Sequence, residues 1–168
     1  IHNARQTALR VAAETGAVVA PTLPYSFSGG ELPGTINVSP HVMCLMVSDI
    51  LKGLAASGFR NLFVILGHGG SENLRALQEE VKLFVRSNAN RDDVVVAFCP
   101  VWDFSPMWLD HFKKRDYHAA LVETSLMMYW ASDQVRDDVV LDAPEVAESL
   151  RDDPDNYQHV ERFLDDPH

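Results

Sequence analysis

Residues 61–66, Asn-Leu-Phe-Val-Ile-Leu, form an almost unbroken apolar run that ends at a Gly-His-Gly-Gly turn. An apolar run of this length is typical of a strand that is covered on both faces in a parallel sheet. Beyond the turn, apolar residues recur at helical spacing, at Leu74, Leu77, Val81 and Phe84. A buried strand, a tight glycine-rich turn and a helix in succession are the building unit of an α/β sheet.

Upstream of this unit the sequence predicts a helix, a short strand and a second helix. Residues 4–12 keep helical apolar spacing, and Gly16 suits the position that follows a helix end. Residues 17–20, Ala-Val-Val-Ala, then indicate a short buried strand. The second helix is expected over residues 40–57, because a favoured N-cap residue, Ser39, precedes it and a proline occupies its first position.

A long loop and two further elements complete the predicted order. Residues 22–40 are rich in Pro, Gly and Ser without either period, which indicates a loop of the kind that often carries function. Residues 94–98 predict a third buried strand, followed by a loop rich in Pro and Trp and by a helix over residues 119–130. Strands that alternate with helices predict an α/β fold with a mostly parallel sheet and helices on both faces.

Composition and charge argue against several classes of protein. The chain is 46% hydrophobic and 23% charged, as is ordinary for a globular protein. Its formal net charge of -10 opposes binding to nucleic acid, which needs clustered Lys and Arg. No apolar run approaches the roughly 20 residues of a membrane-spanning helix, so we expect a cytoplasmic protein with no membrane partner. Cys44 and Cys99 lie in apolar segments without CxxC spacing and are interpreted as core residues.

His68 is the first candidate for chemistry. Ligands of open α/β sheets gather at the carboxyl ends of the strands, and His68 follows a predicted strand almost directly. Its glycine neighbours leave space around the imidazole, which suits a metal ligand. Two other interpretations stay open. Either the glycines serve only to adopt positive φ beside an exposed histidine, or the turn binds phosphate, although it lacks the Lys of a P-loop.

A second candidate group lies at the start of the helix predicted over residues 119–130. His118 is at its edge, and apolar residues that follow Glu123 would partly bury the Glu123 carboxylate. A buried carboxylate needs a cation, a metal or backbone donors, so Glu123 has either a metal role or a structural one. An imidazole at His118 suits proton transfer near neutral pH, with helix capping or plain exposure as alternatives.

Four segments resemble the creatininase (creatinine amidohydrolase) family in their order and spacing. They are residues 17–25 (Ala-Val-Val-Ala-Pro-Thr-Leu-Pro-Tyr) with Ser28, residues 33–36 (Pro-Gly-Thr-Ile), residues 67–70 (Gly-His-Gly-Gly) and residues 118–125 (His-Ala-Ala-Leu-Val-Glu-Thr-Ser). The resemblance implies a three-layer αβα fold and hydrolysis of a non-peptide C–N bond in a small cyclic amide or formamide. It also implies two divalent metal ions, zinc, manganese or iron, and a homohexamer.

Carried over position by position, the resemblance assigns roles to single residues. His68 and Glu123 match metal ligands of the family, and His118 matches the histidine viewed as its proton shuttle. Ser28 matches a serine of the substrate loop. The residues expected to bind the substrate are Ser28, Tyr25 and Trp102. Trp102 lies in the loop rich in Pro and Trp, where packing against the core is an equal alternative to lining a pocket.

Departures from the family pattern bear on the function. Ala120 and Ser71 replace the usual Gly and Asn, which bears on substrate choice. Family members carry a Glu-x-His pair and an Asp before the first helix, and Ile1 stands about where that segment would end. We therefore expect residues 1–168 to be a single creatininase-like domain without the N-terminal strand that carries those ligands and without the C-terminal end.

Two alternatives to the enzyme remain from the sequence. One is a non-catalytic binding or assembly subunit that kept the fold and lost the metal site. The other, a dinucleotide-binding domain, is disfavoured because no predicted strand is followed by GxGxxG.

Overall fold

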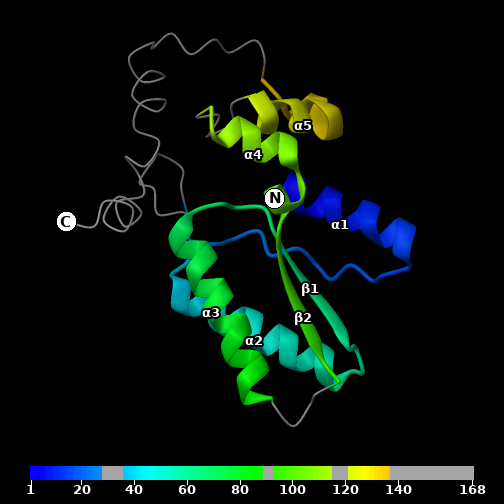
Figure 1. Ribbon diagram of the computed structural model, residues 1–168, viewed down its shortest axis with the longest axis vertical. Coiled ribbons are helices and arrows are strands. Elements are labelled where there is room, and N and C mark those ends of the chain that lie inside the picture. The colour runs from blue at the N-terminus through cyan, green and yellow to red at the C-terminus, as the bar shows by residue number, and fades with distance from the viewer. Residues whose placement is uncertain (28–35, 89–92, 115–120, 137–168) are drawn as a thin grey trace, which may run out of the picture.

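The computed structural model describes residues 1–27, 36–88, 93–114 and 121–136 (Figure 1). Two strands, β1 (Asn61–Leu66) and β2 (Val95–Pro100), lie side by side in parallel, with Asn61 opposite Val95 and Leu66 opposite Pro100. Helix α3 (Ser71–Ser87) lies between them in the chain. The strand–helix–strand unit predicted from the apolar pattern is therefore confirmed, with β1 at its predicted bounds and β2 starting at Val95 and ending at Pro100.

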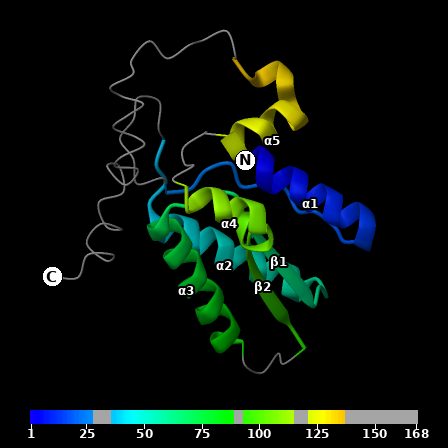
Figure 2. The ribbon, with the colours of Figure 1, turned by 45° about the horizontal axis from the view of Figure 1, so that its top comes forward.

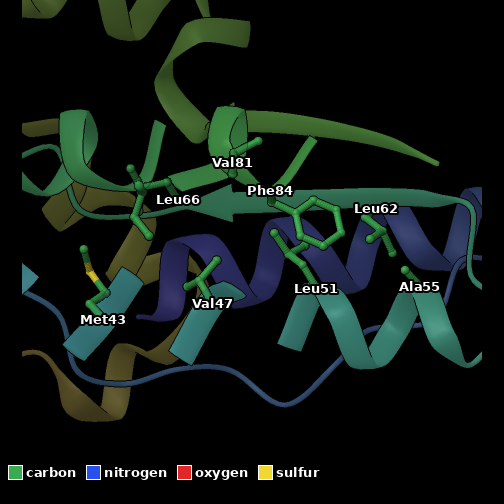
Figure 3. Close-up of a cluster of buried hydrophobic side chains, with 9 residues drawn as sticks. Met43, Val47, Leu51, Ala55, Leu62, Leu66, Val81 and Phe84 are labelled. Carbon is green, nitrogen blue, oxygen red and sulfur yellow. The ribbon is translucent and has the colours of Figure 1, made fainter. Parts of the chain in front are cut away.

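Helices α2 (Pro40–Ala56) and α3 cover one face of this sheet (Figure 3). Helix α2 begins as predicted, because the Ser39 Oγ accepts a hydrogen bond from the backbone N–H of Val42 at 3.5 Å. The apolar stripes of both helices meet the inward side chains of β1. The resulting cluster consists of Met43, Val47, Leu51, Ala55, Leu62, Leu66, Leu77, Val81 and Phe84. We refer to this side of the sheet as the closed face.

Among the described residues, the opposite face is covered only towards the carboxyl ends of the strands. Helix α1 (His2–Thr15) lies on that side, across the sheet from α2 and α3 (Figures 1 and 2). Phe63 is 64% exposed and Val95 is 59% exposed, so the amino half of this open face carries bare apolar side chains. The prediction that β1 is covered on both faces is wrong for this half of the described sheet. An apolar run shows that both faces of a strand carry apolar side chains, but it does not show which elements pack against them.

The segment after β2 contains a helix that the sequence analysis placed in a loop. A 3₁₀ turn, η1 (Val101–Phe104), leads into α4 (Pro106–Phe112). The Ser105 Oγ accepts a hydrogen bond from the backbone N–H of Trp108 at 3.3 Å, and a proline opens the helix. This is the same serine–proline start as in α2, so the missed signal was a capping signal.

Helix α5 (Leu121–Ala131) confirms the last predicted helix over the residues that are described, and η2 (Ser132–Gln134) follows it. Helix α5 packs against α1, and the guanidinium of Arg10 lies 5.0 Å from the centre of the Tyr129 ring. Throughout the described residues, every helix is too short or too polar to cross a lipid bilayer.

The strand predicted over residues 17–20 is absent. Helix α1 ends as expected, with Gly16 at φ 74° in the left-handed region, but the chain then continues without a strand partner among the described residues. Val18 is 76% exposed, and Val19 lies beside Arg5 and Leu9 of α1. A helix offers no ladder of backbone hydrogen bonds, so a chain that runs along one does not become a strand.

Candidate functional site

The turn that carries His68 lies at the carboxyl end of β1, where the sequence placed it. Four residues connect β1 to α3, and the carbonyl of Gly70 accepts the first helical hydrogen bond from the N–H of Leu74 at 2.9 Å. His68 itself is half-buried, and its Nε2 atom has no solvent-accessible surface to speak of. The imidazole is therefore held within the structure at the edge where open sheets bind ligands.

Two of the three glycines of this turn, Gly67 and Gly70, are needed for close approach, and none of the three is needed for an unusual backbone. Positive φ occurs at Gly16 and Gly58 but at none of the glycines of the turn, so the interpretation that they supply positive φ is wrong. A Cβ on Gly70 would lie 2.6 Å from the Nε2 of His68, and a Cβ on Gly67 would lie 2.9 Å from the Cβ of Ala4. Such distances are shorter than van der Waals contact. The missing side chains leave room for the imidazole on one side and for α1 on the other.

Asn73 is a residue of this region that the sequence analysis missed. It is fully buried at 0% exposure, and its Nδ2 donates a hydrogen bond to the backbone carbonyl of His68 at 3.5 Å. Its Oδ1 is buried with no hydrogen-bond partner among the described residues. A buried polar atom left unpaired costs about 1–3 kcal/mol. The available signal was periodicity, because Asn73 occupies a core position four residues before Leu77.

Trp102 links the turn to an aromatic cluster. A Cβ on Gly69 would lie 3.4 Å from the Trp102 ring, so the ring covers this glycine. The ring centre of Trp102 lies 6.5 Å from that of Trp108, in an edge-to-face arrangement that favours aromatic pairs, and 6.4 Å from that of Phe112, to which it is tilted. Trp102 also packs against the hydrophobic core. Packing beneath the loop is thus observed for Trp102, and contact with a substrate stays a prediction.

Glu123 lies in the first turn of α5 and is half-buried, in agreement with a carboxylate that is partly covered by its neighbours. Helix α1 contacts both regions: its Ala4 lies against Gly67 beside His68, and α5 packs on α1. The described residues contain no group of three His, Cys, Asp or Glu side chains placed to hold one metal ion. That His68 and Glu123 bind the same metal ions stays a prediction.

The remaining predicted site residues are placed as follows. Tyr25 is 53% exposed on the extended segment after α1. Ser28 and His118 lie outside the described residues.

Both cysteines are half-buried, but only Cys44 packs against the hydrophobic cluster, whereas Cys99 lies opposite Ile65 in the sheet, outside that cluster. The Sγ of Cys44 donates to the carbonyl of Ala76 at 3.4 Å. Burial raises the pKa of the Cys44 thiol, and the charge of Glu80 raises it further. Burial likewise raises the pKa of Cys99. Raised pKa values keep both groups as thiols at neutral pH, which agrees with packing roles and disfavours nucleophilic ones.

Comparison with known proteins shows the family to which the chain belongs. A family model described as creatinine amidohydrolase matches residues 1–164. The chain belongs to the creatininase family. The creatinine amidohydrolase of Pseudomonas putida is 32% identical over 152 residues, which make up 80% of this chain and 58% of that protein. The chain thus spans less than two thirds of the length of this relative.

Solved creatininase structures confirm the fold class. A manganese form is 29% identical with a TM-score of 0.69 and shares 82% of this chain and 60% of its own length. A substituted creatininase in a Zn-Zn form is 29% identical with a TM-score of 0.68, over 80% of this chain and 58% of its own. The predicted three-layer αβα architecture with a parallel sheet is therefore that of creatininases.

The donor chemistry of the described residues fits such metals in part. An imidazole and a carboxylate, which His68 and Glu123 supply, are ligands that zinc accepts, and both also suit manganese. The absence of a Cβ at Gly70 leaves space next to the Nε2 of His68. Two side chains do not complete a coordination sphere, and the described residues supply no third one beside them.

Proposed function

We propose that the protein carrying this chain is a metal-dependent amidohydrolase that cleaves a non-peptide C–N bond of a small cyclic amide or formamide. The observation that supports it most is the glycine-lined, half-buried imidazole of His68 at the carboxyl end of β1 in a chain of the creatininase family. The zinc and manganese forms of solved creatininases support a pair of divalent ions as the cofactor.

In this proposal the residues of the chain have three separate tasks. His68 and Glu123 would hold divalent metal, whose Lewis acidity activates water and polarises an amide carbonyl. His118 would deliver a proton to the departing nitrogen, as a general acid of suitable pKa range can. Tyr25, Ser28 and Trp102 would bind and orient the substrate.

The test separates metal ligands from the proton donor. In the natural full-length protein we expect about two divalent ions per chain, as for two-metal hydrolases, and hydrolysis of creatinine, another cyclic amide or a formamide. His68→Ala and Glu123→Gln should lose metal and turnover together. His118→Ala should keep its metal and lose turnover by about 10²–10⁴-fold, the usual contribution of a general acid.

A control histidine makes the test specific. His41 is exposed on α2, and His41→Ala should retain both metal and turnover. Undiminished turnover of His118→Ala would remove it from the mechanism. A full-length protein with neither metal nor turnover would contradict the enzyme and favour the alternative of a binding or assembly subunit.

The predicted homohexamer and the predicted boundaries of the domain are part of the same proposal. Light scattering of the full-length protein, which measures the mass of the assembly, tests the hexamer.

A further inference from the structure

The side chain of Asn73 stands where an apolar residue would be expected. It shares the inward stripe of α3 with Leu77, Val81 and Phe84, and like them it is buried. Its Oδ1 has no partner among the described residues, whereas its Nδ2 donates to the backbone carbonyl of His68. The amide nitrogen of Asn73 therefore bonds to the turn, whereas its amide oxygen has no hydrogen-bond partner among the described residues.

An unsatisfied atom in a core position indicates that stability alone does not explain the residue. A leucine has the same branching and number of side-chain heavy atoms as an asparagine, and it would join the neighbouring apolar cluster without an unpaired oxygen. Natural sequences break such local rules mainly at functional sites. What asparagine adds over leucine here is the donor that reaches the main chain of His68.

The glycine-rich backbone of the turn gives a reason for such an anchor. Glycines surround His68, and glycine leaves the backbone freer than any other residue. The gap at Gly70 makes room for the imidazole but cannot fix the peptide that carries it. A hydrogen bond from the rigid helix α3 to the carbonyl of His68 supplies that constraint.

We infer that Asn73 is a positioning residue, which fixes the main chain of His68 so that its imidazole keeps one orientation at the carboxyl end of β1. What the imidazole then binds rests on the proposed function. The positioning itself is a property of the metal-free chain. Partners that orient a metal ligand in this way typically contribute about 10–100-fold to metal affinity.

The experiment compares Asn73→Leu with Ser71→Ala in the full-length protein. Ser71 is a matched control, because it lies in the same turn region, is 8% exposed, and its Oγ makes no hydrogen bond to His68 or to any other described residue. The first readout is the NMR signal of the His68 ring in metal-free protein, assigned by its loss in His68→Ala. The second is zinc affinity by calorimetry.

For Asn73→Leu we expect an unchanged or higher melting temperature, a selective shift of the His68 signal and a loss of zinc affinity of about 10–100-fold. Ser71→Ala should leave the His68 signal and the zinc affinity unchanged. If leucine is not accommodated, Asn73→Ala removes the amide without adding bulk, and the His68 signal should shift in the same way.

A folded Asn73→Leu protein with an unchanged His68 signal would overturn the inference. So would a fall in melting temperature together with equal changes at all histidines, which is what a merely structural amide would give. If the unsubstituted protein binds no zinc through His68, the proposed function fails, and the signal in metal-free protein still decides the role of Asn73.

Discussion

The two faces of the sheet differ in what covers them and in what they carry. The closed face, under α2 and α3, is lined by side chains that are almost fully buried, such as Phe84 at 3% exposure. On the open face, the same residue type at Phe63 is 64% exposed. The closed face holds the described part of the chain together, whereas α1 lies on the open side and α5 packs against α1.

The described part of the chain is therefore stabilised mainly by the hydrophobic cluster of its closed face. The Oδ1 of Asn73, which has no hydrogen-bond partner in the described part of the chain, lies where the closed face meets the turn of His68. A core can tolerate a few such atoms when the rest of the cluster compensates. The closed face thus offers the rigid support on which a binding site can be built.

The difference between the faces is tested best by replacing a phenylalanine with alanine on each face. Phe84→Ala should lower the free energy of unfolding by about 3–5 kcal/mol, since it empties a filled core position. Phe63→Ala should change it by no more than about 0.5 kcal/mol, as for most surface positions. Urea unfolding of the natural protein measures both. Equal losses would mean that the open face is covered in solution, by another part of the protein or by a second copy.

A smaller effect is expected where α1 meets the edge of the sheet. Gly67→Ala should lower the free energy of unfolding by about 1–3 kcal/mol, the cost of overpacking, because the new Cβ would meet Ala4 at 2.9 Å. Gly69→Ala is the matched control, since its Cβ would lie in ordinary contact with Trp102 at 3.4 Å. Thermal unfolding measures the two variants side by side. If both tolerate alanine equally, α1 does not dock at this edge.

The sequence predicted the closed face well because its signals are local. The helical spacing of Leu74 and Leu77, the continuous run of β1 and the cap at Ser39 each determine their element without help from distant residues. The strand over residues 17–20 failed for the opposite reason. A strand forms only against a partner, and a four-residue apolar run does not reveal whether a partner or a helix lies beside it.

For the candidate site, the sequence predicted His68 and Glu123 but not the contacts that hold His68 in place. The position of His68 at the end of β1 followed from the order of the elements, and the half-buried state of Glu123 from its apolar neighbours. That Gly70 makes room for an imidazole, or that Asn73 reaches back to a carbonyl, depends on how α3 leaves the turn. Such contacts depend on the three-dimensional path of the chain, so the order of residue types hardly indicates them.

Alanine should have the opposite effect on stability at a glycine on the solvent-exposed side of α2 from its effect at Gly67. Gly53 is exposed within α2, has a negative φ, and a Cβ there would have open space around it. Gly53→Ala should therefore raise the free energy of unfolding by about 0.5–1 kcal/mol, the usual gain in a helix interior. Urea unfolding is again the measurement. A loss instead of a gain would show that the outer side of α2 is a contact surface in the natural protein.

The smallest effect concerns the contact between α1 and α5 beside the open face. The hydrogen bond and the charge of Arg10 lower the pKa of Tyr129, so Arg10→Ala should raise that pKa towards its ordinary value. Titration of the phenolate absorbance measures the shift, Tyr129→Phe identifies the group, and Arg10→Lys should retain part of the lowering.

The sign of the accompanying pH dependence follows from the direction of the shift. An acidic group whose pKa is lowered on folding adds stability only above its folded pKa and loses it as the pH falls through that value. The ionic part of the Arg10–Tyr129 contact is therefore absent at neutral pH, where the phenol is protonated. The stability difference between the parent and Arg10→Ala should widen only in alkaline solution. An unchanged pKa of Tyr129 in Arg10→Ala would mean that α1 does not meet the last turn of α5 at Arg10, and the arrangement of helices on the open side would have to be revised.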